Sequence, residues 1–108
     1  MAKLTEEEYS ALEAKYAGKR LARVEMASGT FVFRQPTRQE HRIFKAMILD
    51  STTTATAYDD LFLRTVVSPE MADAAKMLED RPGLTSNKKI IQALNRLSGQ
   101  EDEEEGKG

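Results

Sequence analysis

The residue best suited to acid–base chemistry near neutral pH is the single histidine of the chain, His41. It stands between Gln39 and Arg42, on the polar side of a predicted helix. General-base or nucleophilic catalysis needs a partner side chain beside the imidazole, and no motif in the sequence identifies one. We therefore interpret His41 as a solvent-facing helix residue and predict that the protein is not an enzyme.

Groups that could bind a metal ion or a phosphate are equally isolated. The chain has no cysteine, and one histidine cannot form the usual zinc sites. Its glycines are scattered, so there is no glycine-rich phosphate loop. The acidic pairs Asp59–Asp60 and Glu79–Asp80 lie on predicted helices, where adjacent side chains point in different directions. We predict no cofactor and no metal site.

A row of basic residues follows one side of the helix predicted for residues 38–49. Arg38, Arg42 and Lys45 have the spacing i, i+4 and i+7. One interpretation is a docking surface for an acidic partner or for phosphate. The other is a charged outer face that is balanced by Glu40 and by other helices, and the many acidic residues of the chain favour it. No aromatic residues alternate with this row, so we expect no nucleic-acid binding.

The second half of the same helix is apolar over a wide face, which Leu49 is expected to extend. This is more apolar surface than one packed face requires, and methionine suits adaptable binding surfaces. The alternative is that these side chains fill the core. We predict that the apolar residues and the basic row form a partner-binding surface: Ile43, Phe44, Met47, Ile48, Arg38, Arg42 and Lys45.

The residues before this helix form a junction between a strand and a helix. Phe31 and Phe33 point to one face of an extended segment, which Pro36 interrupts. Thr37 has the type and position of an N-cap, and Glu40 three residues later completes a capping box. Because a two-stranded hairpin is marginal alone, the phenylalanine face must pack on helices.

Periodicity divides the rest of the chain into short elements. A capping box of Thr5 and Glu8 predicts the first helix, and Ser28–Gly29 predicts a hairpin turn. The fold class that follows is α+β, with a small N-terminal β-hairpin packed on a bundle of four to five short helices. The predicted strands cover residues 20–26 and 30–34, and the predicted helices cover residues 6–16, 38–49, 55–67, 69–78 and 86–97.

Local signals mark the boundaries of the later helices. Ser68 has the position of an N-cap, and Pro69 that of the first residue of a short helix. Residues 81–83 predict a turn, since they contain adjacent proline and glycine. Either Thr85 or Ser86 is expected to cap the last helix.

Charge is distributed unevenly along the chain of 108 residues. Residues 101–105 supply five acidic charges in a row, and removing them from the net charge of −2 leaves about +3. We predict one domain at residues 1–99 and a disordered acidic tail at residues 100–108. No apolar run is long enough to span a bilayer, and the N-terminus is not a signal peptide. We expect no membrane contact and a cytoplasmic location.

The order of these motifs resembles the small tail assembly chaperones of long-tailed, lambda-like bacteriophages. A hairpin ends in an aromatic-x-aromatic-Arg-x-Pro-Thr-Arg-x-Glu junction, and a later helix ends in Arg-Thr-Val-Val-Ser-Pro. The resemblance covers residues 21–99. Its matching positions are Phe31, Phe33, Arg34, Pro36, Thr37, Arg38 and Glu40, then Thr65 to Pro69, then Pro82, Gly83 and Leu84, with Leu94 and Leu97.

The resemblance implies a non-enzymatic role in the host cytoplasm. Such chaperones bind the long, helical tape measure protein, keep it soluble before the tail tube polymerises, and are absent from the finished virion. It also implies self-association. Many are made in two lengths by a programmed ribosomal frameshift, and the longer form carries a domain thought to recruit tail tube protein.

The last residues permit such a frameshift. Glu105, Gly106 and Lys107 can be encoded as GAG, GGA and AAG, which contain the slippery heptamer G-GGA-AAG. This predicts an overlapping downstream reading frame in the gene. A second hypothesis is another small phage interaction module, for example an inhibitor of a host defence complex. A small enzyme or DNA-binding regulator is the weakest hypothesis, because neither a catalytic constellation nor a strongly basic recognition helix is present.

Overall fold

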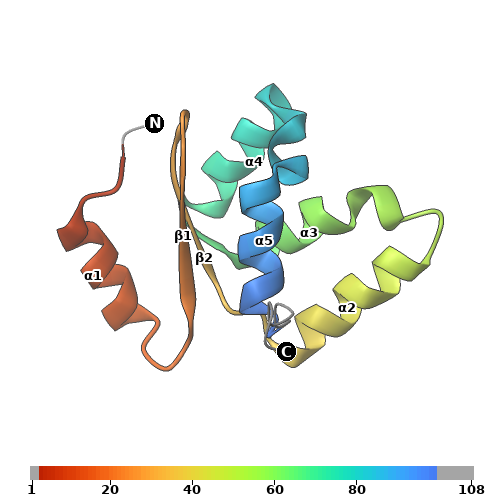
Figure 1. Ribbon diagram of the computed structural model, residues 1–108, viewed down its shortest axis with the longest axis horizontal. Coiled ribbons are helices and arrows are strands. Elements are labelled where there is room, and N and C mark those ends of the chain that lie inside the picture. Colours follow the sequence, from red (N-terminus) through yellow and green to blue (C-terminus); the bar gives the residue numbers. More distant parts are fainter. Residues whose placement is uncertain (1–2, 100–108) are drawn as a thin grey trace, which may run out of the picture.

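The computed structural model describes residues 3–99, and this part of the chain is α+β, as predicted. A three-stranded antiparallel sheet stands between helix α1 and the remaining helices (Figure 1). In chain order the elements are α1 (Glu6–Lys15), β1 (Leu21–Met26), β2 (Gly29–Arg34), α2 (Arg38–Leu49), the 3₁₀ helix η1 (Thr54–Thr56), α3 (Ala57–Thr65), β3 (Val66–Ser68), α4 (Met71–Asp80), the 3₁₀ helix η2 (Pro82–Ser86) and α5 (Lys88–Leu97).

The predicted hairpin is confirmed and gains a third strand. β1 and β2 pair in antiparallel register, with Val24 opposite Phe31. β2 is the central strand because β3 pairs with its other edge, where Val66 lies opposite Phe33. The helix predicted for residues 55–67 is therefore too long. It ends at Thr65, since the β-branched residues that follow pair with the sheet.

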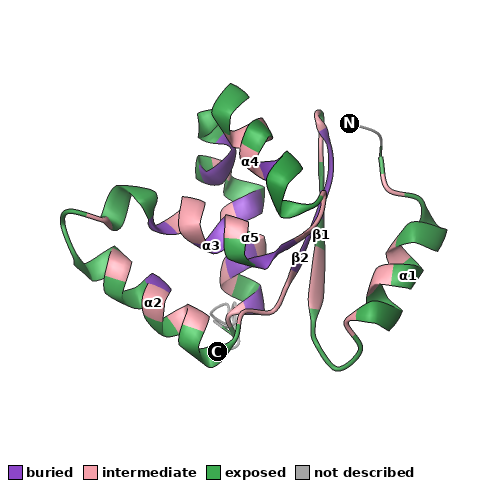
Figure 2. Cartoon of the chain, turned by 180° about the vertical axis from the view of Figure 1, so that it is seen from behind, coloured by how far each residue is buried: buried purple, intermediate pink, exposed green. Residues whose placement is uncertain are grey.

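The core lies between the sheet and α3, α4 and α5 (Figure 2). Phe31, Phe33 and Phe62 are fully buried. The Phe62 ring lies edge-on to both of the others, with centroid distances of 5.7 Å to Phe31 and 5.2 Å to Phe33. The phenylalanine face of β2 thus packs on helices, as the sequence pattern predicts.

Two predicted helix starts are wrong. Ser68 belongs to β3 rather than to an N-cap, and Pro69 follows it through a cis peptide bond. The cap position of α4 is Glu70. Asn87, not Thr85 or Ser86, caps α5, because its Oδ1 accepts a hydrogen bond of 2.8 Å from the Lys89 amide.

The predicted turn around Pro82 and Gly83 is instead the first part of η2, with Pro82 in its first turn. Proline favours that position, because its fixed φ suits the start of a helix and its missing N–H would have no helical partner there. The prediction of a disordered acidic tail falls on residues 100–108, outside the described residues.

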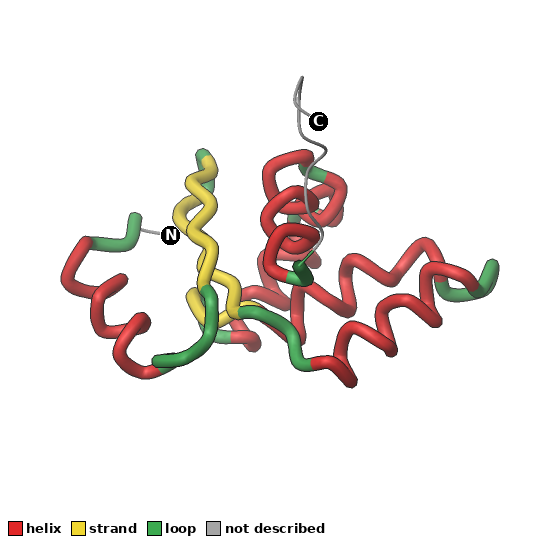
Figure 3. Tube along the Cα trace, turned by 60° about the horizontal axis from the view of Figure 1, so that its bottom comes forward, coloured by secondary structure: helices red, strands yellow, loops and turns green. Residues whose placement is uncertain are grey.

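Helix α1 lies on the side of the hairpin that faces away from the core (Figures 1 and 3). The predicted capping box of Thr5 and Glu8 begins it. The Arg23 guanidinium of β1 lies 4.5 Å from the centre of the Tyr9 ring and 3.2 Å from the Glu6 carboxylate. No residue of α1 is buried, but Tyr9 and Leu12 are half-buried, so partial apolar burial adds to the polar and cation–π contacts that hold this helix.

Candidate partner-binding surface

Arg34, the last residue of β2, joins three elements. Its guanidinium donates two hydrogen bonds of 2.9 Å to the Glu40 carboxylate in the first turn of α2. The same group donates to the Arg64 carbonyl at 2.7 Å, near the C-terminal end of α3. A cation is favoured at that end of a helix. Arg34 therefore fixes the base of the α2–α3 pair to the sheet.

Glu40 also completes the predicted capping box of α2. The Thr37 amide donates to Glu40 Oε1 at 2.9 Å, and the Glu40 amide donates to Thr37 Oγ1 at 3.1 Å. The hydrogen bonds from Arg34 are the main cause that lowers the pKa of the Glu40 carboxyl from 4.5 to about 2. The same bonds raise the pKa of the Arg34 guanidinium. The Pro36 break, the cap and the ion pair together set where α2 begins.

This geometry predicts an acid-sensitive contribution to stability. A carboxyl with a lowered folded-state pKa stabilises the fold above its unfolded pKa, and that contribution is lost as pH falls from about 4.5 to about 2. Urea unfolding measures the free energy of unfolding at each pH. Its decrease between pH 5 and pH 2 should be about 2 kcal/mol smaller in Glu40→Gln than in the parent protein. Glu79→Gln, at an exposed position of α4, is the matched control and should follow the parent. If the free energy of unfolding fell equally with pH in all three proteins, the Glu40 carboxyl would not be the source of this acid sensitivity.

The predicted apolar face of α2 is divided between core and surface. Phe44 is buried, and its ring lies edge-on to Tyr58 of α3 with a centroid distance of 5.0 Å. Ile43 and Met47 are half-buried. Ile48 is 36% exposed and Leu49 is 80% exposed. Phe44 thus packs within the domain, while the C-terminal end of α2 presents apolar side chains to solvent.

The basic row is exposed along its length, and Leu49 continues it. Arg38, Arg42, Lys45 and Leu49 follow one another at intervals of four, three and four residues, so they share one side of the helix. Leu49 therefore does not extend the face that holds Phe44, contrary to our prediction. Within residues 3–99 the three basic residues have no ion-pair or hydrogen-bond partner through their side chains.

The prediction that Glu40 balances the charge of the basic row is wrong. Glu40 points inward to Arg34, where only 17% of its side chain is exposed. The α2–α3 pair projects from the rest of the domain, with its connecting loop at the far end (Figure 3). An unbalanced basic row beside exposed apolar side chains is a surface that could bind an acidic, partly apolar partner.

Among residues 3–99, the side chains suited to acid–base chemistry contact other residues rather than one another. His41 is half-buried rather than solvent-facing: its ring centroid lies 6.3 Å from that of Phe44, and its buried Nδ1 has no partner among residues 3–99. Asp60 pairs with Arg64 at 2.6 Å, and Asp59 accepts a hydrogen bond from Thr85. The described residues include no cluster of acidic, histidine or cysteine side chains that could hold a metal ion. None of the described helices has the length and apolarity to cross a membrane.

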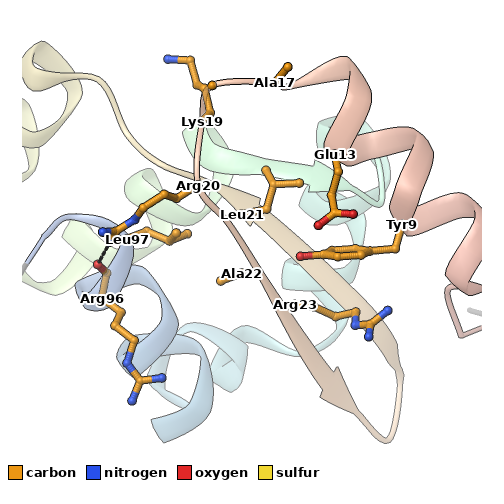
Figure 4. A pocket seen from close by; sticks show the side chains of 11 residues that line it. Tyr9, Glu13, Ala17, Lys19, Arg20, Leu21, Ala22, Arg23, Arg96 and Leu97 are labelled. Carbon is orange, nitrogen blue, oxygen red and sulfur yellow. Dashed lines mark hydrogen bonds between the residues drawn. The ribbon is translucent and has the colours of Figure 1, made fainter.

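A groove along β1 was not predicted from the sequence. A hollow of about 760 Å³ lies between Tyr9 of α1, Arg23 of β1 and Leu97 of α5 (Figure 4). Arg20 crosses one end of it and donates a hydrogen bond of 2.6 Å to the Arg96 carbonyl. The basic residues at and just before the start of β1, Lys19, Arg20 and Arg23, are a signal in the sequence. Its meaning depends on α5, which is more than sixty residues away along the chain.

Comparisons with protein-family models, with curated proteins and with solved structures found no match for this chain. Of the predicted surface residues, Ile48 and the basic row are exposed, Ile43 and Met47 are half-buried, and Phe44 is internal.

Proposed function

We propose that this protein is a non-enzymatic phage tail assembly chaperone, which binds and solubilises a tape measure protein before the tail tube polymerises. The observation that carries the proposal is the exposed end of α2. Leu49 is 80% exposed beside Ile48 and in line with the exposed basic row. A chaperone needs such open apolar surface and needs no reaction site.

The chemistry of the client fits this surface. A long helical protein without its tube leaves the apolar stripe of each amphipathic segment open to water and to aggregation. The four-three-four spacing of the exposed row is the spacing with which one helix packs along another. Leu49 supplies an apolar contact, and Arg38, Arg42 and Lys45 attract acidic residues that flank the client's stripe.

The remaining parts of the proposal follow the resemblance. The protein acts in the host cytoplasm, self-associates around its client, and leaves before the virion is complete. A longer product, made by frameshifting near Gly106 and Lys107, brings in tail tube protein. The nucleotide sequence of the gene tests this last part, because an ordinary stop codon without an overlapping frame would remove it.

Leu49→Asp is expected to weaken client binding without unfolding the protein. The change places a charge in an apolar contact and should weaken binding about tenfold or more. Since Leu49 is exposed, the free energy of unfolding should change by less than about 0.5 kcal/mol. The measurement is the soluble fraction of the tape measure protein when it is co-expressed with each variant.

Met71→Asp is the matched control, because Met71 is also an exposed apolar residue, 55% exposed, but lies on α4. It should leave the client soluble. The proposed function fails if the unchanged chain does not increase the client's soluble fraction. The assignment of the surface fails if Leu49→Asp and Met71→Asp act alike.

A further inference from the structure

The free edge of the sheet lies in the groove along β1. β1 is an outer strand, and among the described residues no strand pairs with its other side. The Arg20 carbonyl accepts a hydrogen bond from the Gln35 amide, so by antiparallel alternation the backbone groups of Leu21, Arg23 and Glu25 point away from β2. Such an edge offers unpaired donors and acceptors to an extended segment.

The groove runs along most of β1. Its first hollow, between α1 and the start of β1, shares Ala22, Arg23 and Arg96 with a second hollow of about 320 Å³ between β1 and α5. The second hollow reaches Glu25 at one wall and Lys89 at the other. α1 and α5 lie on either side of β1 (Figure 1), and the two hollows, which share three lining residues, together follow the edge of the strand.

Basic side chains outnumber acidic ones around this groove. Two of the basic groups are held in place: Arg20 by the Arg96 carbonyl, and Arg23 by Glu6. The acidic groups of its walls are Glu13 and Glu25. The basic residues are Lys19, Arg20, Arg23, Lys89 and Arg96.

We propose that this groove binds the chain's own acidic segment, residues 101–105, in an extended conformation beside β1. The segment carries five acidic side chains, and the side chains that line the groove are more often basic than acidic. Only residues 98–100 separate the segment from Leu97, the last residue of α5, which lines the groove. Gly99 has a left-handed φ of 88°, a conformation with which a chain can turn sharply after a helix.

The acidic segment is also about as long as the edge of β1. Five extended residues span about 17 Å, and a six-residue strand such as β1 spans about 20 Å. α5 runs antiparallel to β1, because Lys89 lies near Glu25 while Arg96 lies near Arg20. A segment that turns back after α5 therefore passes along β1 from Leu21 towards Met26. This proposal does not depend on the identity of the client or on the role of α2.

The full-length protein can report its own docking, because the chain has no cysteine. A spin label on Gly106→Cys should broaden the backbone amide signals of Glu25 and Lys89 at low ionic strength. These two residues lie at the far end of the groove, so closeness along the chain does not explain their broadening. The broadening should disappear at about 1 M salt, where the Debye length is about 3 Å. It should also disappear when all five acidic residues are changed to their amides.

Two charge reversals separate the groove from the basic row of α2. Lys19→Glu combined with Lys89→Glu should lower the ratio of docked to free tail about fivefold. Lys45→Glu, on α2, should leave the ratio unchanged. Broadening that is confined to α2, that survives high salt, or that is unchanged by the amide tail would overturn the proposal. So would broadening seen only between different molecules in a mixture of spin-labelled and isotope-labelled protein.

Discussion

Phe62→Ala is expected to lower the free energy of unfolding by about 3 to 5 kcal/mol. Phe62 of α3 is fully buried and touches the rings of Phe31 and Phe33 edge-on. Its removal takes away apolar surface and leaves a cavity where the sheet meets its helices. Since small domains are stable by only about 5 to 15 kcal/mol, the loss is a large fraction of the total. Urea unfolding followed by circular dichroism measures it.

Met71→Ala provides the comparison for this loss. Met71 is apolar and helical but 55% exposed, so its truncation should cost less than about 0.5 kcal/mol. If Phe62→Ala cost no more than Met71→Ala, the aromatic cluster would not be the centre of the core. Phe62→Leu should cost less than Phe62→Ala, because it keeps most of the buried volume.

Arg34→Ala is expected to cost about 3 kcal/mol. The change leaves the Glu40 carboxylate without its guanidinium and the Arg64 carbonyl without a donor. Only 19% of the Arg34 side chain is exposed, so water replaces these bonds poorly. Arg34→Lys should restore only part of the loss, because an ammonium group cannot bind both carboxylate oxygens and the carbonyl in the same geometry.

A double-mutant cycle of Arg34→Ala and Glu40→Ala measures the pair itself. We expect a coupling free energy of about 1 to 2 kcal/mol. The control cycle uses Asp60 and Arg64, an ion pair one helical turn apart that is 30% and 40% exposed. That coupling should be about 0.5 kcal/mol or less. Equal coupling in both cycles would contradict the role of Arg34 as the joint between β2, α2 and α3.

The elements with complete local signals could be predicted from the sequence. α2 begins and ends where its pattern predicts, because Thr37 and Glu40 form their capping box within four residues. The hairpin of β1 and β2 is equally local. In both cases the deciding contacts lie close together in the chain, so the sequence holds all the required information.

The errors come from contacts between distant residues. Val66 and Val67 fit a helix pattern as well as a strand, and the pairing with β2 decides between them. Ser68 and Pro69 match a helix start, yet the same pairing draws Ser68 into the sheet. The local patterns at these residues fit a helix, and the tertiary pairing with β2 outweighs them.

The candidate surface was predictable in part. Residue spacing placed the basic row on one side of α2, and the row is exposed. The same spacing could not show that the Glu40 carboxylate pairs with Arg34, because Arg34 lies outside the helix. The groove along β1 was beyond prediction, since its walls come from three segments that only the folded chain brings together.

The third strand has a consequence for how the domain can vary in length. The chain leaves the sheet after Arg34 and returns at Val66, directly opposite Phe33. The two ends of the α2–α3 hairpin are therefore fixed side by side by strand pairing and by the Arg34 bonds, while α3 itself packs in the core. Whole helical turns added to both helices would lengthen the projecting arm and leave the sheet register unchanged. The length of the projecting α2–α3 pair can therefore change while the sheet and its register stay the same.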